Sequence, residues 1–400
     1  MPGSLDKLSV EDLKVEGRRV LLRVDFNVPL DEKGAVTDDT RIRESLPTIK
    51  FLVEHKARLI VVAHMGRPKG KPSEKLRLDP AAKKLGDLLG MPVRKINVVV
   101  GPEATAAAQA LKDGEILMLE NVRFEPGEEK NDEALSKSLA ALAELYVNDA
   151  FGTAHRAHSS TVGVAKFLPQ AAAGYLMQKE LKYLGAALEN PERPFTAVLG
   201  GAKVSSKLSV ISKLAEKVDN LLIGGGMAYT FLRAMHMNVG KSLVEEDRIK
   251  DAKEILKLLI DRDVKWLLPF DHVITDKLAA DGIPQIVTRE GIPPDMMAVD
   301  IGPSTIEMFE NVLRQSKTIL WNGPMGVFEI MQFSTGTYRM ALAISGCKGT
   351  SIVGGGDSVA AINNLGIAGK FSHVSTGGGA SLEFLEGIEL PGLAALTNRR

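Results

Sequence analysis

Short apolar runs alternate with amphipathic stretches along the whole chain, and this alternation limits the possible folds more than any other feature. In the first half the runs are Arg19–Val24, Leu59–Ala63, Ile96–Val100, Ile116–Leu119 and Leu145–Val147. In the second half they are Thr196–Leu199, Asn220–Ile223, Trp266–Leu268, Ala298–Ile301, Thr318–Trp321 and Ser351–Val353. Runs of this length and composition are typical of strands buried on both faces.

The stretches between the runs have helical character, for example Lys207–Val218 and Arg248–Asp261. Strand alternating with helix predicts parallel sheets that are covered by helices on both faces. About eleven strands are more than one open twisted sheet usually holds. A length of 400 residues also suits two domains. The predicted fold class is therefore α/β, with two doubly wound parallel-sheet domains joined by an interdomain helix and a hinge.

The boundary between the two domains is expected near residues 170–190. One helical stripe runs through this region and consists of Met177, Leu181, Leu184 and Leu188. An ordinary surface helix would show the same stripe, but the complete α/β pattern on both flanks favours an interdomain helix. The prediction is an N-terminal domain over 1–172, the interdomain helix over 173–190 and a C-terminal domain over 191–379.

Composition and charge exclude several classes of protein. Lysine plus arginine and aspartate plus glutamate number 50 each, so the net charge is zero, which argues against a nucleic-acid or membrane-surface binder. No stretch approaches the roughly 18 consecutive apolar residues of a transmembrane helix, and the first residues lack the apolar core of a secretory signal. Cys347 is the only cysteine, so an intramolecular disulfide is impossible. A reducing, cytoplasmic location is expected.

Cations and small polar residues follow the predicted strands of the first half. They include Asp25, Asn27, His64, Arg67, Arg123, His155, Arg156 and His158, with Arg41 at an expected helix start. Ligands of open α/β sheets bind beyond the carboxyl ends of the strands. Guanidinium groups from separate loops suit a compact anion there. Each arginine taken alone could instead be an exposed surface residue or half of a structural ion pair.

Glycines follow the predicted strands of the second half. They lie at Gly200–Gly201, Gly224–Gly226, Gly302, Gly323, Gly326, Gly354–Gly356 and Gly377–Gly379. Glycine lets backbone N–H groups turn toward a ligand and lets the ligand approach closely, and a following helix N-terminus attracts phosphate. These loops predict an extended polyanionic ligand such as a nucleotide. Strand termination alone would explain one or two of them.

Two lysines stand at the expected start of a helix. Lys203 and Lys207 are four residues apart, so they would share one helix face in its first turns. A cation there opposes the helix dipole at a cost of about 0.3–1 kcal/mol. A bound polyphosphate would reverse that sign, so the pattern indicates function, although solvated lysines remain the alternative.

Several standard motifs are missing from the sequence. It has no G-x-x-x-x-G-K-[ST] and no G-x-G-x-x-G, and its cysteine and histidines lack zinc-binding spacing. One domain suited to a small anion and one suited to polyphosphate together indicate phosphoryl transfer. The reacting atoms must come within about 3–3.5 Å of each other, so a hinge is expected, with the helix over 174–190 as its seat.

The motifs of the strand ends, taken together, resemble the phosphoglycerate kinase family over essentially the full chain. They are RVDFNVPLD, HMGRPKG, LENVRF, VNDAFGTAHRAHSS, LGGAKVSSK, IGGGMAYTF, WNGPMGVFE, GGGDS and STGGGASLE. The resemblance implies the reaction 1,3-bisphosphoglycerate + ADP ⇌ 3-phosphoglycerate + ATP, with Mg²⁺ on the nucleotide, in a monomer. It also implies that the C-terminal segment, 380–400, folds back onto the N-terminal domain.

The resemblance carries roles to individual residues. The triose-phosphate positions are Asp25, Asn27, Arg41, His64, Arg67, Arg123 and Arg156. The nucleotide positions, with the glycine loops included, are Gly201, Lys203, Lys207, Gly225, Gly226, Gly302, Asn322, Glu329, Gly354, Gly355, Gly356, Asp357 and Ser358. Glu329 would hold the ribose hydroxyls, and Asp357 would engage the metal–phosphate group.

The expected mechanism needs no general base, because the acceptor is a carboxylate that is already ionised near neutral pH. Arg41 and Lys203 are expected to clamp the transferring phosphoryl group, together with Mg²⁺ and the N–H groups of Gly355 and Gly378. Two other classes fit the pattern less well: a solute-capturing protein with two lobes, and a dehydrogenase. No nucleic-acid or membrane partner is expected.

Overall fold

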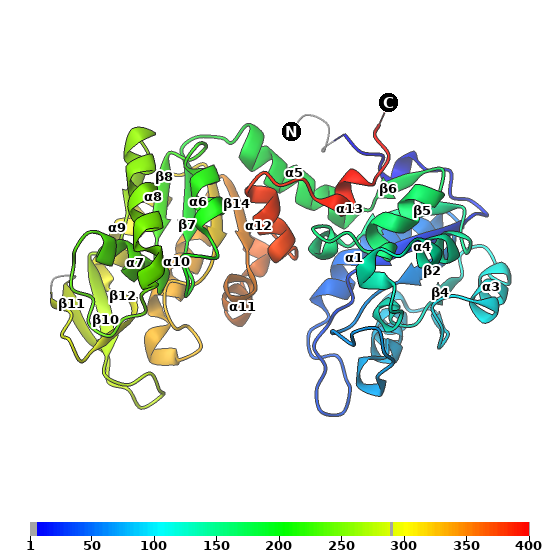
Figure 1. Ribbon diagram of the computed structural model, residues 1–400, viewed down its shortest axis with the longest axis horizontal. Helices are drawn as coiled ribbons and strands as arrows, with labels where there is room; N and C mark the ends of the chain where they lie inside the picture. The colour runs from blue at the N-terminus through cyan, green and yellow to red at the C-terminus, as the bar shows by residue number, and fades with distance from the viewer. Residues whose placement is uncertain (1–5, 289–290, 400) are drawn as a thin grey trace. The chain divides into compact units, whose positions relative to one another are not determined.

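The computed structural model describes residues 6–288 and 291–399, and the chain divides into two compact units (Figure 1). Unit 1 comprises Met1–Lys182 and Glu389–Arg400, and unit 2 comprises Tyr183–Ile388. The boundary falls inside the segment predicted as the interdomain helix. The C-terminal segment belongs to unit 1 from Glu389 onward, nine residues later than the predicted start at 380.

Unit 1 is built on a six-stranded sheet in which every strand pair is parallel. The strand order is β3 (Arg94–Lys95), β4 (Ile116–Met118), β2 (Arg58–Val62), β1 (Arg19–Val24), β5 (Leu145–Asp149) and β6 (Ala171–Ala173). The central strands are almost wholly buried, which explains why they consist of apolar runs. Its helices are α1 (Thr40–Glu54), α2 (Asp79–Leu89), α3 (Pro102–Gln109), α4 (Glu133–Ala140) and α13 (Pro391–Ala394).

Unit 2 has a second six-stranded parallel sheet. The strand order is β15 (His373–Val374), β14 (Thr350–Gly354), β13 (Thr318–Asn322), β7 (Phe195–Leu199), β8 (Asn220–Ile223) and β9 (Lys265–Leu267). Its helices are α6 (Leu208–Leu214), α7 (Met227–Ala234), α8 (Ile249–Asp261), α9 (Pro303–Leu313), α10 (Thr335–Ser345), α11 (Gly356–Asn364) and α12 (Gly379–Leu385).

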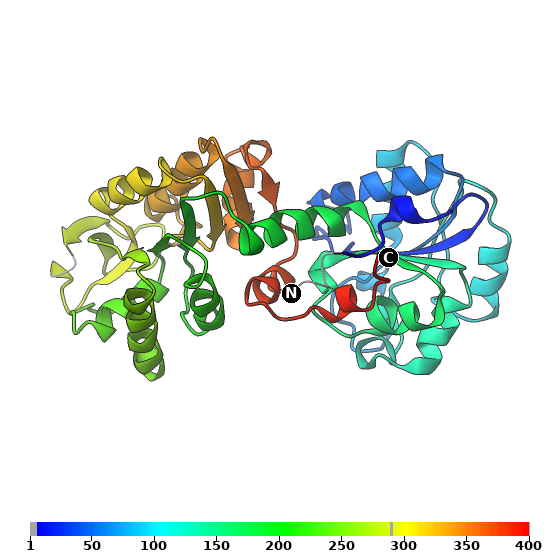
Figure 2. The ribbon, with the colours of Figure 1, turned by 90° about the horizontal axis from the view of Figure 1, so that it is seen from above.

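Helices cover both faces of the unit 2 sheet. Figure 2 shows α6 and α8 on one side and α9 and α10 on the other. A core of wholly buried apolar side chains lies beneath α9 and α10 and includes Phe309, Trp321 and Met340. The predicted fold class, two doubly wound parallel-sheet domains, is confirmed by these two sheets.

A third, antiparallel sheet in unit 2 was not predicted. It consists of β11 (Gln285–Thr288), β10 (Asp271–Thr275) and β12 (Met297–Ile301). The run Ala298–Ile301 was expected in the parallel sheet, and this expectation was wrong because an apolar run does not reveal the direction of its partner. The run Ile96–Val100 was also wrong as a strand: the paired residues are Arg94–Lys95, and residues 96–100 are irregular.

The helix between the units is α5 (Tyr175–Glu189). Figure 2 shows it as one unbroken helix in green. Its predicted stripe is buried at Met177, Leu181 and Leu184. Because Lys182 is the last residue of unit 1 on this helix, the first half of α5 belongs to unit 1 and the second half to unit 2.

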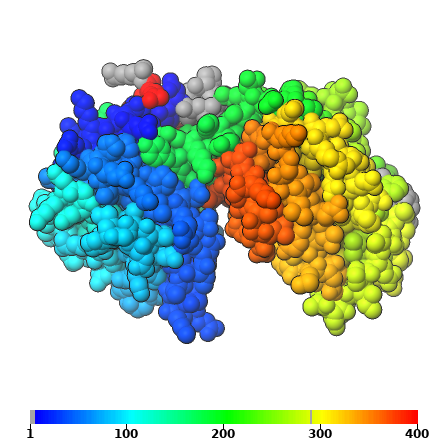
Figure 3. All heavy atoms as spheres, turned by 180° about the vertical axis from the view of Figure 1, so that it is seen from behind, coloured from blue at the N-terminus to red at the C-terminus, as the bar shows by residue number. Residues whose placement is uncertain are grey.

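The two ends of the described chain meet within unit 1. Lys7 Nζ donates to Leu396 O at 3.0 Å and to Asn398 Oδ1 at 2.8 Å. Figure 3 shows the red C-terminal atoms next to the blue N-terminal ones. Arg399 also forms an ion pair with Asp12 at 2.8 Å. These contacts attach the last segment to the N-terminal half of the chain.

We predict that Leu320→Ala destabilises unit 2 far more than Leu342→Ala does. Leu320 lies in the central strand β13 and is 1% exposed, whereas Leu342 on α10 is 48% exposed. Loss of a buried leucine costs about 2–5 kcal/mol, while exposed positions usually change stability by less than about 0.5 kcal/mol. Urea unfolding followed by tryptophan fluorescence measures the difference. Equal midpoints for the two variants would contradict the assigned core.

Candidate functional site

The carboxyl ends of the unit 1 strands bring the predicted cationic residues together. β1, β2, β4 and β5 are parallel, so the residues that follow them leave the sheet at one edge. Arg41 comes from the first turn of α1, as expected. Its Nη1 lies 2.5 Å from Asp25 Oδ2, and the other oxygen of that carboxylate lies 3.9 Å from His64 Nδ1.

Backbone and side-chain hydrogen bonds fix the loops that carry these groups. The Gly66 N–H donates to Asn27 Oδ1 at 2.8 Å, and Arg123 Nη1 donates to Gly66 O at 2.7 Å. Three loops from separate strands therefore meet around one residue, Gly66. Arg67, the next residue, has an exposed side chain.

His64 shows how close the arginines lie. Its pKa is held well below the usual value, first by burial and then by Arg23, Arg123, Arg41 and Arg156. Arg23 Nη2 lies 3.2 Å from His64 Nδ1, and the charges of the other three arginines also act on the ring. The pKa of His158 falls to about 4, again through burial and then through Arg123, Arg23 and Arg156. Neutral histidines reduce the repulsion that the arginine cluster must tolerate.

Arg123 has the clearest unmet need for an anion. Its side chain is 3% exposed, and burial is the first cause that lowers its pKa. Nε and Nη2 are buried and make no hydrogen bond to any group of the described residues, although Nε lies 3.5 Å from Glu129 Oε1 in an ion pair. A buried unsatisfied charged donor is costly, and a bidentate anion would satisfy both nitrogens. The predicted small-anion site is supported by this geometry.

The sequence reasoning missed three supporting residues. Arg23 is wholly buried, and its Nε donates to Ser160 Oγ at 2.8 Å. The Ser160 hydroxyl donates in turn to the buried carboxylate of Glu128 at 2.6 Å. Glu128 is thus a buried counter-charge beneath the arginines. The sequence did contain a sign of these partners, because Arg23 stands inside the apolar run that forms β1. A charged side chain in a buried strand requires partners.

A pocket of about 460 Å³ opens at the carboxyl edge of the unit 2 sheet. Five predicted residues line it: Gly201, Gly225, Gly226, Glu329 and Asp357. Apolar side chains line it as well, among them Leu243, Met325 and Val327. A concave, mostly apolar pocket with a few polar groups at its margin is typical of a small-molecule site.

The glycines of this pocket first serve to pack the loops against one another. The N–H of Gly201 donates to Pro324 O at 2.9 Å, and the N–H of Gly225 donates to Met325 O at 2.9 Å. Gly225 has φ +66°, and a Cβ there would lie 2.5 Å from Gly201 N. The expectation that these N–H groups turn toward a ligand was therefore wrong. Their contribution is close approach, which leaves room for the ligand.

Lys207 is the buried cation of this edge. It is 7% exposed, and its ammonium group donates to Asn322 Oδ1. Burial lowers the pKa of Lys207 to about 8, against the raising effect of Asp357. Lys207, Asn322 and Asp357 therefore lie at one place, and a second anion would hold the lysine in its charged form.

The start of α11 supplies the free backbone donors. Gly354 ends β14, Gly355 precedes the helix with φ +89°, and Gly356 is its first residue. The first N–H groups of a helix have no acceptor within it. Ser358 is wholly buried, and its hydroxyl accepts from Gly323 N–H at 2.7 Å, so it ties β13 to this helix. Gly378 precedes α12 in the same manner, with φ +53°.

Two predicted features differ in the structure. Lys203 and Lys207 lie in the turn before α6 rather than in its first turns, because the Ser205 hydroxyl bonds to Glu245 and the Ser206 hydroxyl bonds to Lys203 O. Lys203 is exposed.

Gly302 is the other difference, since it precedes α9 and is not among the residues that line the pocket. The Asp271 carboxylate already accepts the first N–H groups of α9, those of Ser304 and Thr305, at 2.9 Å and 2.7 Å.

The residues at this edge fit a magnesium ion that accompanies phosphate. Asp357 is exposed in the first turn of α11. Its carboxylate oxygens are the hard ligands that Mg²⁺ prefers, usually one or two of them together with phosphate oxygens and water.

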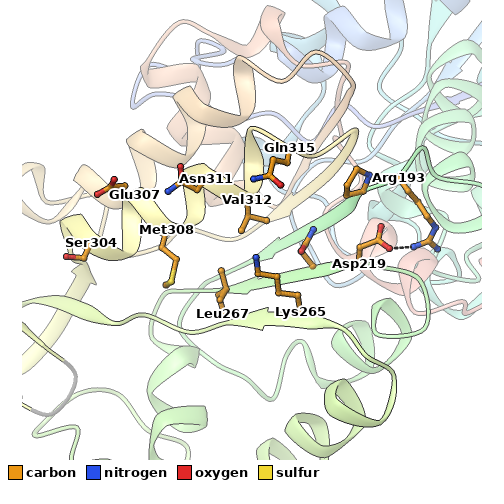
Figure 4. A pocket seen from close by; sticks show the side chains of 12 residues that line it. Arg193, Asp219, Lys265, Leu267, Ser304, Glu307, Met308, Asn311, Val312 and Gln315 are labelled. Carbon is orange, nitrogen blue, oxygen red and sulfur yellow. Dashed lines mark hydrogen bonds and ion pairs between the residues drawn. The ribbon is translucent and has the colours of Figure 1, made fainter.

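A second pocket of unit 2 is larger, at about 830 Å³, but lies away from this chemistry. Figure 4 shows α9 residues such as Glu307 and Asn311 across from Lys265 and Leu267 of β9. Arg193 and Asp219, which precede β7 and β8, also line it, so it lies at the amino ends of the strands. Ligands of parallel sheets bind at the opposite edge, so we assign the functional site to the smaller pocket.

Comparison with known proteins follows this geometry. The family model described as phosphoglycerate kinase matches residues 10–388. The chain belongs to the phosphoglycerate kinase family. The phosphoglycerate kinase of Moorella thermoacetica is 57% identical over 393 residues, which cover 98% of this chain and all of that protein. That of Koribacter versatilis is 55% identical over 403 residues, covering 99% of this chain and all of that protein.

Solved structures agree with this assignment. The phosphoglycerate kinase structure from Coxiella burnetii has a TM-score of 0.89 at 40% identity and covers 97% of this chain and 98% of its own. The enzyme from Pyrococcus horikoshii OT3 gives 0.85 at 35% identity with the same coverage. The resemblance of the motifs is confirmed, and the chain is a kinase, that is, a transferase enzyme. Within the described residues, no helix combines the length and the apolar character needed to cross a membrane.

We predict that ADP binding weakens as pH rises through about 8, the pKa of Lys207. The ammonium form attracts phosphate, so its loss lowers the association constant, by at most tenfold per pH unit. Lys207→Gln should bind ADP more weakly at pH 7 and show no such decline. Lys213→Gln, an exposed lysine of α6 paired with Glu216, is the matched control and should follow the wild type. Calorimetric titration from pH 7 to 9.5 measures this, and a decline retained in Lys207→Gln would remove Lys207 from the site.

Proposed function

We propose that this phosphoglycerate kinase family member transfers a phosphoryl group from 1,3-bisphosphoglycerate to ADP, giving 3-phosphoglycerate and ATP, and that the reaction is reversible. The observation that carries the proposal is the division of the anion sites. Unit 1 holds the arginine cluster around His64, and unit 2 holds the glycine-lined pocket with Lys207 and Asp357. Membership of the family supports this assignment of substrates.

In the proposed arrangement, unit 1 binds the triose phosphate and unit 2 binds the nucleotide. Arg123 offers to a phosphate Nη2 and Nε, of which only Nε has an ion-pair partner within the described residues, Glu129 at 3.5 Å. Arg156 adds a second cation. Arg41 is more exposed, with 37% of its side chain accessible, and within the described part of the chain its guanidinium forms an ion pair with Asp25 alone. It is thus free to move its guanidinium toward the transferring group. Mg²⁺, held beside Asp357, would neutralise charge on the nucleotide phosphates.

The chemistry requires positioning and charge neutralisation but no general base. A β-phosphate oxygen of ADP forms a bond to phosphorus, and the bond from phosphorus to the acyl oxygen breaks, leaving a carboxylate. No proton moves at either oxygen, which agrees with a His64 that burial and arginines keep neutral. Arg41 and Lys203, with the N–H groups of Gly355 and Gly378, would stabilise the charge in transit.

Transfer further requires that the bound groups come within about 3–3.5 Å of each other. We propose that a hinge allows this and that α5, which crosses the unit boundary, is its seat. Closure would also keep water, a competing acceptor, away from the reacting group.

The protein is proposed to act as a cytoplasmic monomer in glycolysis and gluconeogenesis. A coupled assay of ATP formation from 1,3-bisphosphoglycerate and ADP, with and without Mg²⁺, tests the activity; no ATP formation with Mg²⁺ would end the proposal.

We predict that Arg41→Ala lowers kcat by about 10³-fold or more while the Kd for ADP stays unchanged. An arginine that stabilises a transferring phosphoryl group contributes about 10³–10⁵ in turnover, and Arg41 lies in unit 1, outside the nucleotide pocket. Arg43→Ala is the matched control, because Arg43 is on the same helix but bonds to Asp39 in an exposed pair. Steady-state kinetics and ADP titration are the measurements. Equal losses in both variants, or a parallel loss of ADP affinity, would argue against the role.

A further inference from the structure

The start of α5 is held by a carboxyl group from another element. Asp149 is the last residue of β5 and is wholly buried. Its Oδ1 accepts hydrogen bonds from Leu176 N at 2.9 Å and from Met177 N at 3.2 Å. These are first-turn N–H groups of α5, which have no acceptor within the helix. Asp149 thus caps the N-terminus of α5, although it belongs to strand β5 and does not directly precede the helix.

Two further residues complete this attachment. The Thr48 hydroxyl on α1 accepts from Tyr175 N at 2.8 Å, and the N–H of Gly174 donates to Asn148 O at 2.9 Å. A Cβ at position 174 would lie 2.2 Å from Asp149 Oδ1, so the carboxyl reaches the helix only because residue 174 is glycine. We call Asp149, Thr48, Gly174 and the backbone of 175–177 the α5 joint.

Among the residues that the structure describes, the carboxyl of Asp149 forms no ion pair with a cation. Its Oδ2 is buried and makes no hydrogen bond to a group of the described residues. Glu44 of α1 is the charged group among the main influences on the pKa of Asp149, and it is itself paired with Lys179 of α5 at 3.1 Å. On the sheet, Asp149 faces the uncharged Val24 of β1, and β6 contributes only alanines. Burial raises the pKa of Asp149 to about 7, against the lowering effect of Thr48 and the two N–H groups.

The α5 joint lies between elements of the proposed triose-phosphate site and the helix that connects the two units. After Asp149 the chain enters the loop that carries Arg156, and α1 carries Arg41, so the joint adjoins two elements of the proposed triose-phosphate site. From the joint, α5 runs past Lys182 into unit 2. A change at Asp149 therefore acts where the connecting helix begins.

We propose that Asp149 is a positioning residue that fixes the first turn of α5 to unit 1, and that ionisation of its buried carboxyl loosens this attachment. When the joint opens, the carboxyl reaches water and ionises with a pKa near its ordinary value of about 3.9. Opening is then favoured as pH rises, by up to tenfold per pH unit, until the buried form also ionises. The joint is tightest in acid and loosest above about pH 7.

Amide hydrogen exchange at Leu176 and Met177 tests the proposal directly. After correction for the intrinsic rate, the opening equilibrium of the wild type should rise about tenfold between pH 5.5 and 6.5 and level off above pH 7.5. Asp149→Asn keeps the acceptor oxygen but cannot ionise, so its profile should be flat. Asp87→Asn, at an exposed position of α2, removes a carboxylate elsewhere in unit 1 and should follow the wild type. A flat wild-type profile, or a wild-type slope in Asp149→Asn, overturns the proposal.

Two measurements separate titration from ordinary structural support. Thr48→Val removes the acceptor of Tyr175 N–H and should raise opening with the slope between pH 5.5 and 6.5 retained. Because the Thr48 hydroxyl lowers the pKa of Asp149, the levelling of the profile should move to higher pH in this variant. Loss of the slope in that variant counts against Asp149 as its source. In the wild type, which needs no variant to fold, the ¹³C resonance of the Asp149 carboxyl should titrate near pH 7. A midpoint below pH 5 overturns the proposal.

The kinetic consequence rests on the proposed function, in which α5 is the seat of the hinge. Asp149→Asn cannot ionise, so the ratio of wild-type to variant kcat should rise between pH 5.5 and 7 and level off above pH 7.5, with both KM values unchanged. A ratio that stays constant, or falls, overturns the kinetic role. If no phosphoryl transfer is found at all, the proposed function fails, whereas the exchange and titration experiments still decide on the joint.

Discussion

Parallel strands all end at the same edge of their sheet, and every functional feature of this chain follows from that constraint. In each six-stranded sheet the loops after the central strands start about 4.8 Å apart, so residues far apart in sequence become neighbours. Asp25, His64 and Arg123 meet in this way in unit 1. Lys207, Asn322 and Asp357 meet in unit 2. In unit 2 the larger cavity lies instead at the amino ends of the strands.

Gathering like charges costs free energy, and the protein limits that cost in each unit by a different means. In unit 1 the Asp25 carboxylate pairs with Arg41, and His64 stays neutral. Burial raises the pKa of Glu128, while the charge of Arg23 acts in the opposite direction and favours its ionised form. In unit 2 the ammonium group of Lys207 is buried. Burial disfavours the charged form of this lysine and lowers its pKa to about 8. Both arrangements leave donors whose best remaining partner is an anion. An anion that binds at either site would therefore also reduce the free-energy cost of holding these cations together or of burying them.

The sequence predicted the sheets and the strand-end residues well, because buried strands and their exits have local patterns. It failed where partners are distant. The run Ala298–Ile301 is a real strand, but only its pairing with β10 makes the sheet antiparallel. Gly225 is glycine because another loop, at Gly201, lies against it. The turn before α6 is set by Glu245, forty residues away from Ser205, which no local propensity for Lys203–Lys207 reveals.

The proposed reaction, in which each unit binds one substrate, needs a connection between the units that is stiff enough to transmit an orientation and free enough to change it. A single helix is stiff along its length, since each turn is hydrogen-bonded to the next. Its freedom must therefore come from its ends. At the unit 1 end of α5, the buried carboxyl of Asp149, which forms no ion pair within the described residues, takes the place of the capping side chain that usually stands directly before a helix. Such a cap is strong only while the surrounding unit excludes water from it, so the firmness of the connection depends on the packing of β5 and α1, the same elements that lead to Arg156 and Arg41.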